Sequence, residues 1–284
     1  MALFQDTSSC TLQTEVTQGP YYVNGELIRQ NLTDGQDGVP LVLEIQIIDT
    51  STCEPVPALF MDIWNCNSTG VYSGVIANGN GNSNDTGNLN TTFLRGIQQT
   101  DASGVVQFET IFPGHYTGRA THIHLLTHNQ NSTTIRLNDT LLDANNSGPV
   151  HASHVGQLFF DQSLISEVEA LEPYASNSQA LTLSSEDMIL ASEGNATDPF
   201  VQYLLLGDSV QDGILAWISV GIDMTQSQEV TGATTYYETG GMANADKSMG
   251  GGPGGMADGS GGPPDGLNGS SQIGAMSPSG SSML

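Results

Sequence analysis

Short stretches of alternating apolar and polar residues, separated by turn sequences, are the feature that most limits the fold of this chain. Residues 41–49 read Leu-Val-Leu-Glu-Ile-Gln-Ile-Ile-Asp, which is typical of a β-strand with one face in a core. Similar patterns predict further strands at residues 59–64, 105–110, 121–128 and 155–160. Many short strands with few short helices predict a mainly β fold, a two-sheet β-sandwich.

The two ends of the chain differ in composition from the part between them. One helix is expected from Asp161 to Leu171, because its first turn is acidic and Pro173 follows it. From about Gly240 the residues are mostly Gly, Ser, Met and Pro, which cannot offset the entropy lost on ordering. We therefore predict an N-terminal extension (residues 1–13), one domain (residues 14–238) and a disordered tail (residues 239–284).

The segment Tyr-Thr-Gly-Arg-Ala-Thr-His-Ile-His, from Tyr116 to His124, indicates chemistry most strongly. Alternate residues of a strand share a face, so His122 and His124 can present two imidazoles to one point. A His-x-His pair alone is more often two polar residues on a wet face. The phenol of Tyr116 can add an anionic oxygen ligand, which favours ferric iron, and Tyr72 is a second candidate after a Gly-flanked turn.

Two motifs in the chain resemble those of the intradiol ring-cleavage dioxygenases, non-haem ferric enzymes that open catechols between the two hydroxylated carbons. The patterns Trp-x-x-x-x-x-Gly-x-Tyr and Pro-Gly-x-Tyr-x-x-Arg-x-x-His-Ile-His occur here as Trp64 to Tyr72 and Pro113 to His124. The resemblance spans about residues 14–222 and is greatest to the secreted, fungal-type branch. It implies the family's β-sandwich, Fe(III), an aromatic diol and O2 as substrates, and a cis,cis-muconate-type product.

Carried over residue by residue, the resemblance implies four iron ligands: Tyr72, Tyr116, His122 and His124. Tyr72 is also implied to be the ligand that a bound diol displaces and that takes up a proton. Arg119 matches the arginine beside the substrate ring, and Gln157 matches the glutamine that assists it. The Gly-Pro-aromatic segment implies a substrate lining of Thr17, Gly19, Pro20, Tyr21 and Tyr22.

Charge narrows the possible partners. Five basic residues against 30 acidic ones give a net charge of −25, which disfavours nucleic acids, anionic lipids and carboxylated substrates. The sequence contains no run of 18 apolar residues, so no membrane span is predicted. One of the five cations, Arg119, lies inside the motif.

Several features predict a secreted glycoprotein. Asn-x-Ser/Thr sequons are more frequent than composition alone explains, although Asn, Ser and Thr are also ordinary loop residues. They lie at Asn31, Asn67, Asn84, Asn90, Asn131, Asn138, Asn145, Asn195 and Asn268. The first residues are too few for a signal peptide, so a leader either was removed before this numbering or never existed.

The odd number of cysteines favours a removed leader. Cys53 and Cys66 flank one strand and are predicted to form a disulfide, which leaves Cys10 with a partner upstream. Three buried thiols are the alternative. Cys66 as a metal ligand would suit zinc or copper better than ferric iron.

Two other function classes remain open. A non-catalytic binding module of a secreted β-sandwich glycoprotein would bind no iron and be colourless, whereas a zinc or copper centre would indicate a hydrolase or an oxidase.

The Gly/Asn-rich residues 77–92 are interpreted as a mobile rim over the pocket. A homodimer is compatible with the resemblance, but the chain lacks the helical linker before the Gly-Pro-Tyr motif, so the family's dimer interface is not carried over.

Overall fold

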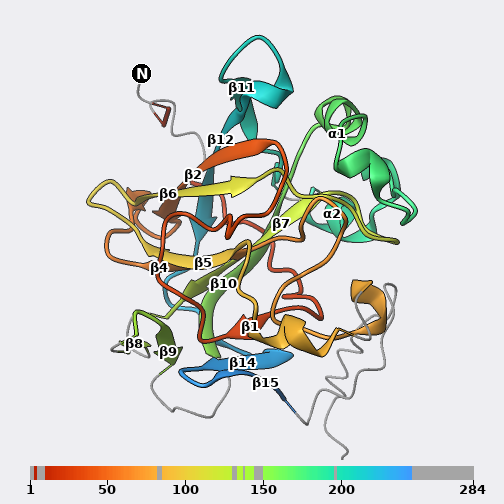
Figure 1. The fold of residues 1–284 in the computed structure, drawn as a ribbon. Coiled ribbons are helices and arrows are strands. Elements are labelled where there is room, and N and C mark those ends of the chain that lie inside the picture. The colour runs from red at the N-terminus through yellow and green to blue at the C-terminus, as the bar shows by residue number, and fades with distance from the viewer. Residues whose placement is uncertain are drawn as a thin grey trace, which may run out of the picture. The chain divides into compact units, whose positions relative to one another are not determined.

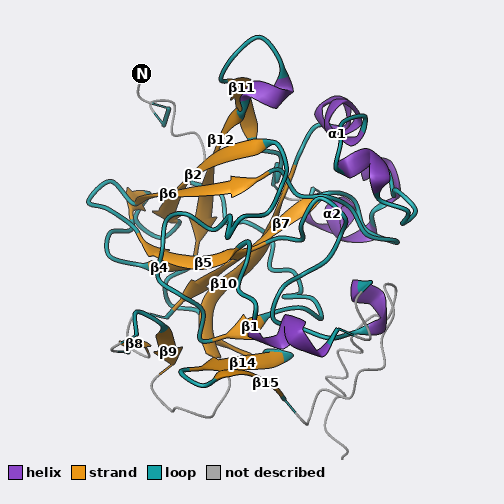
Figure 2. Cartoon of the chain, viewed as in Figure 1, coloured by secondary structure: helices purple, strands orange, loops and turns teal. Residues whose placement is uncertain are grey.

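Two packed sheets form the frame of the protein (Figures 1 and 2). The computed structural model describes residues 3–4, 10–81, 85–129, 133–136, 138–143, 150–194 and 197–244. The first sheet contains, in spatial order, β13 (Gln228–Val230), β10 (Val150–Phe159), β7 (His122–His128), β4 (Phe60–Trp64) and β5 (Arg95–Gln99). The second contains β11 (Gln202–Leu205), β12 (Ile214–Ile222), β2 (Pro40–Asp49) and β3 (Glu54–Pro55), with β6 (Val105–Ile111) also paired to β2.

Smaller elements complete the described chain. Two minor sheets consist of β1 (Val23–Asn24), β14 (Thr234–Tyr237) and β15 (Gly240–Ala243), and of β8 (Thr133–Ile135) and β9 (Leu141–Asp143). The helices are α1 (Gln162–Glu169) and α2 (Met188–Glu193). Short 3-10 turns are η1 (Asn78–Asn80), η2 (Thr86–Asn90), η3 (Tyr174–Ser176), η4 (Ser184–Glu186) and η5 (Val210–Asp212).

The predicted mainly β sandwich is confirmed. Each strand predicted from alternation overlaps an observed one, namely β2, β4, β6, β7 and β10. β10 begins five residues before its predicted start at residue 155, in a stretch whose alternation is interrupted by polar side chains. The predicted helix corresponds to α1, which ends at Glu169, before Leu171.

β7 is buried along its whole length because a different cluster covers each of its faces. Ile123 and Leu125 point into the core between the two large sheets, where they join alternating residues of β2 such as Ile45. Burying each such side chain stabilises the fold by roughly 1.5–3 kcal/mol. Leu126 points the other way, into a second cluster that contains Trp64. Strand alternation therefore places His122 and His124 on the outer face of the sandwich, under this second cluster.

The folded part of the chain is longer at both ends than the predicted domain. Residues Gly240–Ala243 form β15, which pairs with β14 in antiparallel register, so the boundary at residue 238 is too early. The rest of the predicted tail, residues 245–284, lies outside the described residues. At the other end, Leu12 forms a bridge with Gly221, so ordered structure begins before residue 14.

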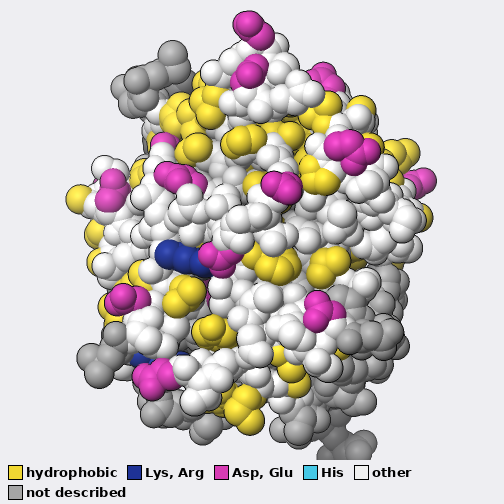
Figure 3. All heavy atoms as spheres, in the orientation of Figure 1, with side chains coloured by type: hydrophobic (Ala, Val, Ile, Leu, Met, Phe, Trp, Pro, Cys, Tyr) yellow, Lys and Arg dark blue, Asp and Glu magenta, His cyan; other side chains and the backbone are white. Residues whose placement is uncertain are grey.

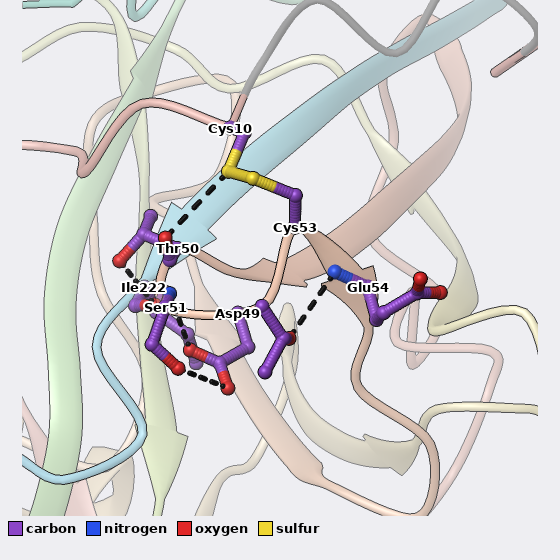
Figure 4. The surroundings of a disulfide bond; sticks show 8 residues. Cys10, Asp49, Thr50, Ser51, Cys53, Glu54 and Ile222 are labelled. Atoms are coloured by element: carbon purple, nitrogen blue, oxygen red, sulfur yellow. Dashed lines mark hydrogen bonds between the residues drawn. A yellow bond between two sulfur atoms is a disulfide. The ribbon is translucent and has the colours of Figure 1, made fainter.

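Cys53 pairs with Cys10, so the predicted Cys53–Cys66 disulfide is wrong (Figure 4). The five-residue strand β4 lies between Cys53 and Cys66. An extended strand of that length spans roughly 16 Å, whereas bridged cysteines need Cα atoms within about 7 Å. The Cα atoms of Cys10 and Cys53 are 5.3 Å apart. Cys66 is a buried thiol whose Sγ donates to the Gly114 carbonyl at 3.3 Å.

The surface reflects the acidic composition. Figure 3 shows acidic side chains scattered over one face, with few basic ones among them. Within the described ranges, the helices are all too short or too polar to cross a bilayer.

Candidate metal centre

A row of directly paired residues crosses four strands on the outer face of the first sheet. Arg95 of β5 is opposite Trp64 of β4, and Trp64 is opposite His124 of β7. His124 is in turn opposite Gln157 of β10. Opposite residues of antiparallel strands share a face, so strand register alone brings together side chains that are up to 93 positions apart in the chain.

Three predicted ligands meet above this row. The Nε2 atoms of His122 and His124 are 3.0 Å apart, and the Tyr116 hydroxyl lies 3.3 Å from His122 Nε2. The Tyr72 ring joins them, with its centroid 5.6 Å from that of Tyr116 and 6.1 Å from that of His124. The structure therefore brings the four predicted side chains together around one point.

The His122 imidazole presents a lone pair to that point, and the His124 ring is held beside it. His122 Nδ1 donates to the Ala120 carbonyl at 2.6 Å, which leaves Nε2 as the acceptor nitrogen. The indole of Trp64 stacks on the His124 ring at 4.9 Å and 3°. Burial lowers the pKa of His122 to about 3 and holds that of His124 well below its usual value, so both rings are neutral.

The phenols fit a cation of high charge. Burial raises the pKa of Tyr116 to about 12 and that of Tyr72 well above its usual value. The Tyr72 hydroxyl is also buried without a hydrogen-bond partner among the described residues. A metal ion would remove both costs, because its charge lowers the phenol pKa and occupies the oxygen's lone pair.

Asparagines of the segment predicted to be a mobile rim hold Tyr72 in place. Asn80, at the end of η1, accepts from the Tyr72 amide at 2.6 Å and donates to its carbonyl at 2.8 Å. Asn88 of η2 donates to the same carbonyl at 2.9 Å. Both asparagines are buried and anchor Tyr72, and the role of this segment as a mobile rim stays a prediction. Residues 82–84 lie outside the described residues.

Arg119 and Gln157 lie next to each other. Arg119 Nη2 donates to Gln157 Oε1 at 2.5 Å, and Gln157 Nε2 donates to the Thr17 carbonyl at 3.1 Å. Arg119 Nε donates to Asp187 Oδ2 at 2.9 Å. Burial by itself would raise the pKa of Asp187, but the charge of Arg119 and backbone donors hold it below its usual value. Asp187 therefore fixes the guanidinium as an ionised partner.

The predicted substrate-lining segment reaches the same place. A Cβ atom on Gly19 would lie 3.1 Å from His124 Cε1, so only glycine allows the chain to pass this close. The Tyr21 ring lies 4.8 Å from the Tyr72 ring and 5.8 Å from the Tyr116 ring. Tyr22 packs on Trp64 at 4.9 Å. Thr17 and Pro20 are exposed, and a role of the five residues in lining a substrate stays a prediction.

The histidines that were not expected to be ligands have carboxylate neighbours. His115 contacts Glu169 at 2.8 Å, His128 contacts Asp62 at 3.4 Å, and His154 contacts Glu15. His151 Nε2 lies 3.9 Å from a carboxylate oxygen of Glu229.

Three functional residues were missed by sequence reasoning: Asp187, Asn80 and Asn88. A helix-capping pattern marks Asp187, which accepts from the amides of Ile189 and Leu190. Nothing in that pattern reveals its second role, because the 68 positions between Asp187 and Arg119 are bridged only in the fold.

Four of the nine predicted glycosylation sites can be examined in the structure. Asn31 and Asn90 are exposed and Asn138 is half-buried. Asn67 is also half-buried: its Oδ1 accepts from the Thr69 amide and hydroxyl and from the Val71 amide, while its Nδ2 donates to Gln36. Asn84, Asn131, Asn145, Asn195 and Asn268 lie outside the described residues.

Comparisons with known proteins indicate the family of this chain. A family model described as Dioxygenase matches residues 17–181, which is more than half of the chain. Among solved structures, an intradiol ring-cleavage dioxygenase from Tetranychus urticae superposes with a TM-score of 0.60 and 27% identity, covering 76% of this chain and 97% of that one. A second structure, described as a dioxygenase, gives a TM-score of 0.59 and 28% identity, covering 76% of this chain and 96% of that one. A search of curated proteins found no sequence match.

Proposed function

We propose, since this chain belongs to the intradiol ring-cleavage dioxygenase family, that it binds Fe(III) and inserts both atoms of O2 into a catechol-type diol. The expected product is of the cis,cis-muconate type. The observation that carries the proposal is the convergence of two buried phenols and two neutral imidazoles, with His122 Nε2 3.0 Å from His124 Nε2 and 3.3 Å from the Tyr116 hydroxyl.

In this proposal the chain's residues divide the work by charge. Tyr72 and Tyr116 offset two of the three positive charges as phenolates, and the two histidines donate neutral nitrogens. When bound, ferric iron supplies the Lewis acidity that withdraws electron density from a chelated diol and makes a ring carbon susceptible to O2. Tyr72 Oη, which has no hydrogen-bond partner among the described residues, is the base that receives a proton from the diol.

Arg119 is the proposed electrostatic group. Its side chain is only 12% exposed, so its charge acts in a poorly solvated place. Gln157 and Asp187 fix the guanidinium from two sides, which pre-organises it to stabilise negative charge that develops on the diol. Tyr21, against both phenols, excludes water from the ligand oxygens.

The charges around the site favour an uncharged diol as the substrate. The charge of Arg119 is already paired with Asp187, and Arg29 is paired with Asp34. Arg95 is buried, and its guanidinium donates to the main-chain carbonyls of Tyr21 and Ser73. A carboxylate on the substrate would therefore meet the field of a strongly acidic protein without a free arginine among these three. We expect catechol and hydroxyquinol to be turned over faster than protocatechuate.

Metal analysis together with an isotope experiment tests the proposal. The full chain, purified from a secretory host, should contain about one Fe per chain and be red to purple from tyrosinate-to-iron charge transfer. With catechol and ¹⁸O2, the product should gain two heavy oxygen atoms. A colourless, iron-free protein without oxygen uptake would instead support a binding module, and zinc or copper in place of iron would indicate a different metalloenzyme.

We also propose that the protein acts outside the cell. The Cys10–Cys53 disulfide and the surplus of sequons support an oxidising secretory route. Expression in a eukaryotic secretory host followed by peptide mapping tests this: exposed Asn31 and Asn90 should carry glycans more completely than half-buried Asn67. A secreted protein without any glycan would contradict the glycoprotein part of the proposal.

A further inference from the structure

Arg95 is a buried cation that the proposed chemistry does not use. Its side chain is 1% exposed, and it begins β5 at the end of the cross-strand row that contains Trp64 and His124. Burying a charge is costly unless hydrogen bonds and nearby charges compensate for it. The contacts of this guanidinium therefore indicate what its burial achieves.

All the hydrogen bonds recorded for the Arg95 guanidinium go to two segments that carry site residues. Nε donates to the Ser73 carbonyl at 3.1 Å and to the Ser73 hydroxyl at 3.0 Å. Nη2 donates to the Ser73 carbonyl and to the Tyr21 carbonyl, both at 2.7 Å. Ser73 follows the ligand Tyr72, and Tyr21 packs on the ring of that ligand. One side chain therefore joins the loop of a metal ligand to the segment that covers it.

The role of a simple counter-ion explains these contacts poorly. The nearest carboxyl oxygen, Glu26 Oε1, is 3.8 Å from Arg95 Nε, which is too far for a hydrogen bond. Burial raises the pKa of Glu26 to about 8, so this carboxyl is mostly protonated at neutral pH. Arg95 Cζ also lies 5.9 Å from the centre of the Tyr72 ring, close enough to favour a negative charge on that phenol.

We propose that Arg95 is a positioning residue, which fixes the Tyr72 ring relative to Tyr21 by clamping the Ser73 and Tyr21 carbonyls with one planar guanidinium. The inference rests on the proposed function, in which Tyr72 is a ligand and a proton acceptor. Lysine cannot replace the clamp, because its ammonium is a single point donor that does not reproduce the geometry of the fork. In an Arg95→Lys variant the two segments would therefore move independently, although the positive charge is kept.

Arg95→Lys tests the clamp, and Arg136→Lys is its matched control. Arg136 also donates to a main-chain carbonyl, that of Tyr236, at 3.1 Å, and its Cζ lies 5.9 Å from the Tyr237 ring. In metal-free, full-length Arg95→Lys, the rate of hydrogen exchange should rise severalfold. The rise should occur in both peptides that cover the two segments, residues 17–23 and 66–75. Arg136→Lys should leave both peptides unchanged.

The iron-loaded protein gives a second readout. Arg95→Lys should keep its iron, shift the charge-transfer band and lose kcat on the order of 10- to 100-fold, the effect of misplacing a reacting group. Ser73→Ala removes one acceptor and keeps the arginine, so it should also raise hydrogen exchange in both peptides, but by less. This variant replaces Arg95→Lys in the test if Arg95→Lys does not fold.

Three results would overturn the clamp: faster exchange in only one of the two peptides, a uniform rise across the core, or an unchanged band in a variant with slower turnover. Because the exchange measurement needs no iron, it separates failure of the clamp from failure of the proposed function, which would appear as a wild-type protein without iron.

Discussion

Asp187 Oδ2 accepts from Arg119 Nε at 2.9 Å and from the Ala120 amide at 2.8 Å, so one carboxylate oxygen fixes both the guanidinium and the backbone that leads into β7. The other oxygen of Asp187 caps α2. Helix capping and the orientation of Arg119 are thus combined in a single side chain.

Asp187→Asn should separate these two roles. Asparagine is as good a helix cap as aspartate, but its amide nitrogen would face the Arg119 and Ala120 donors, so the thermal stability should also fall. The ion pair with Arg119 is lost, and we expect turnover to fall about 10-fold, as for the loss of other supporting partners. Arg119→Ala, which removes the cation itself, should retain iron and lose on the order of 100-fold in kcat. Steady-state kinetics checks the order of the two effects, with Asp212→Asn as a control at a distant cap. Equal turnover in Arg119→Ala and wild type would exclude the electrostatic role.

Tyr116→Phe should remove most of the iron and its visible colour. The phenylalanine ring fills the same space, so the buried cluster around it is kept, but the oxygen 3.3 Å from His122 Nε2 is gone. Metal analysis and the visible spectrum are the measurements. Tyr203→Phe, at a half-buried tyrosine of β11, is the matched control and should keep both. A coloured, iron-replete Tyr116→Phe protein would show that this phenol is not a ligand.

Cys53→Ser should destabilise the protein, whereas Cys66→Ser should leave the Cys10–Cys53 disulfide intact. Cys10 and Cys53 are 43 positions apart, and closing a loop of that size restricts the unfolded chain by up to about 4 kcal/mol in the entropic account. Denaturant unfolding gives the loss of stability, and mass measurement without reduction counts the free thiols. Loss of the disulfide in Cys66→Ser, with the bond kept when Cys10 is replaced by serine, would contradict the observed pairing.

Glu26 should make the protein less stable as the pH rises. Burial raises its folded-state pKa to about 8, while the unfolded value is near 4.5. Between these values the folded state holds a proton that the unfolded state has released, so this contribution is complete below pH 4.5 and is lost as the pH approaches 8. In Glu26→Gln the free energy of unfolding should fall less over this range. The fall should differ between wild type and variant by roughly a few kcal/mol. Unfolding at pH 5 and pH 8 measures it, and identical pH profiles would refute the assignment.

Much of the fold follows from local patterns. The alternation at residues 41–49 predicts β2 because it records which side chains face the core. The same periodicity pairs His122 with His124 on one face of β7, and the two motifs supply the phenols. The cysteine pairing failed because no local pattern shows that the fold brings Cys10 next to Cys53, 43 positions away in the chain.

The sequence by itself determined the strands, the candidate ligand types and the excess of negative charge, because each depends on residues close together in the chain or on composition. Only the tertiary structure decided which distant side chains support the centre. The register of β5, β4, β7 and β10 puts Arg95, Trp64 and Gln157 in line with His124. Loop packing brings Asp187 to Arg119 and Asn80 to Tyr72. Such contacts depend on how sheets and loops close over long separations, and no local pattern records that.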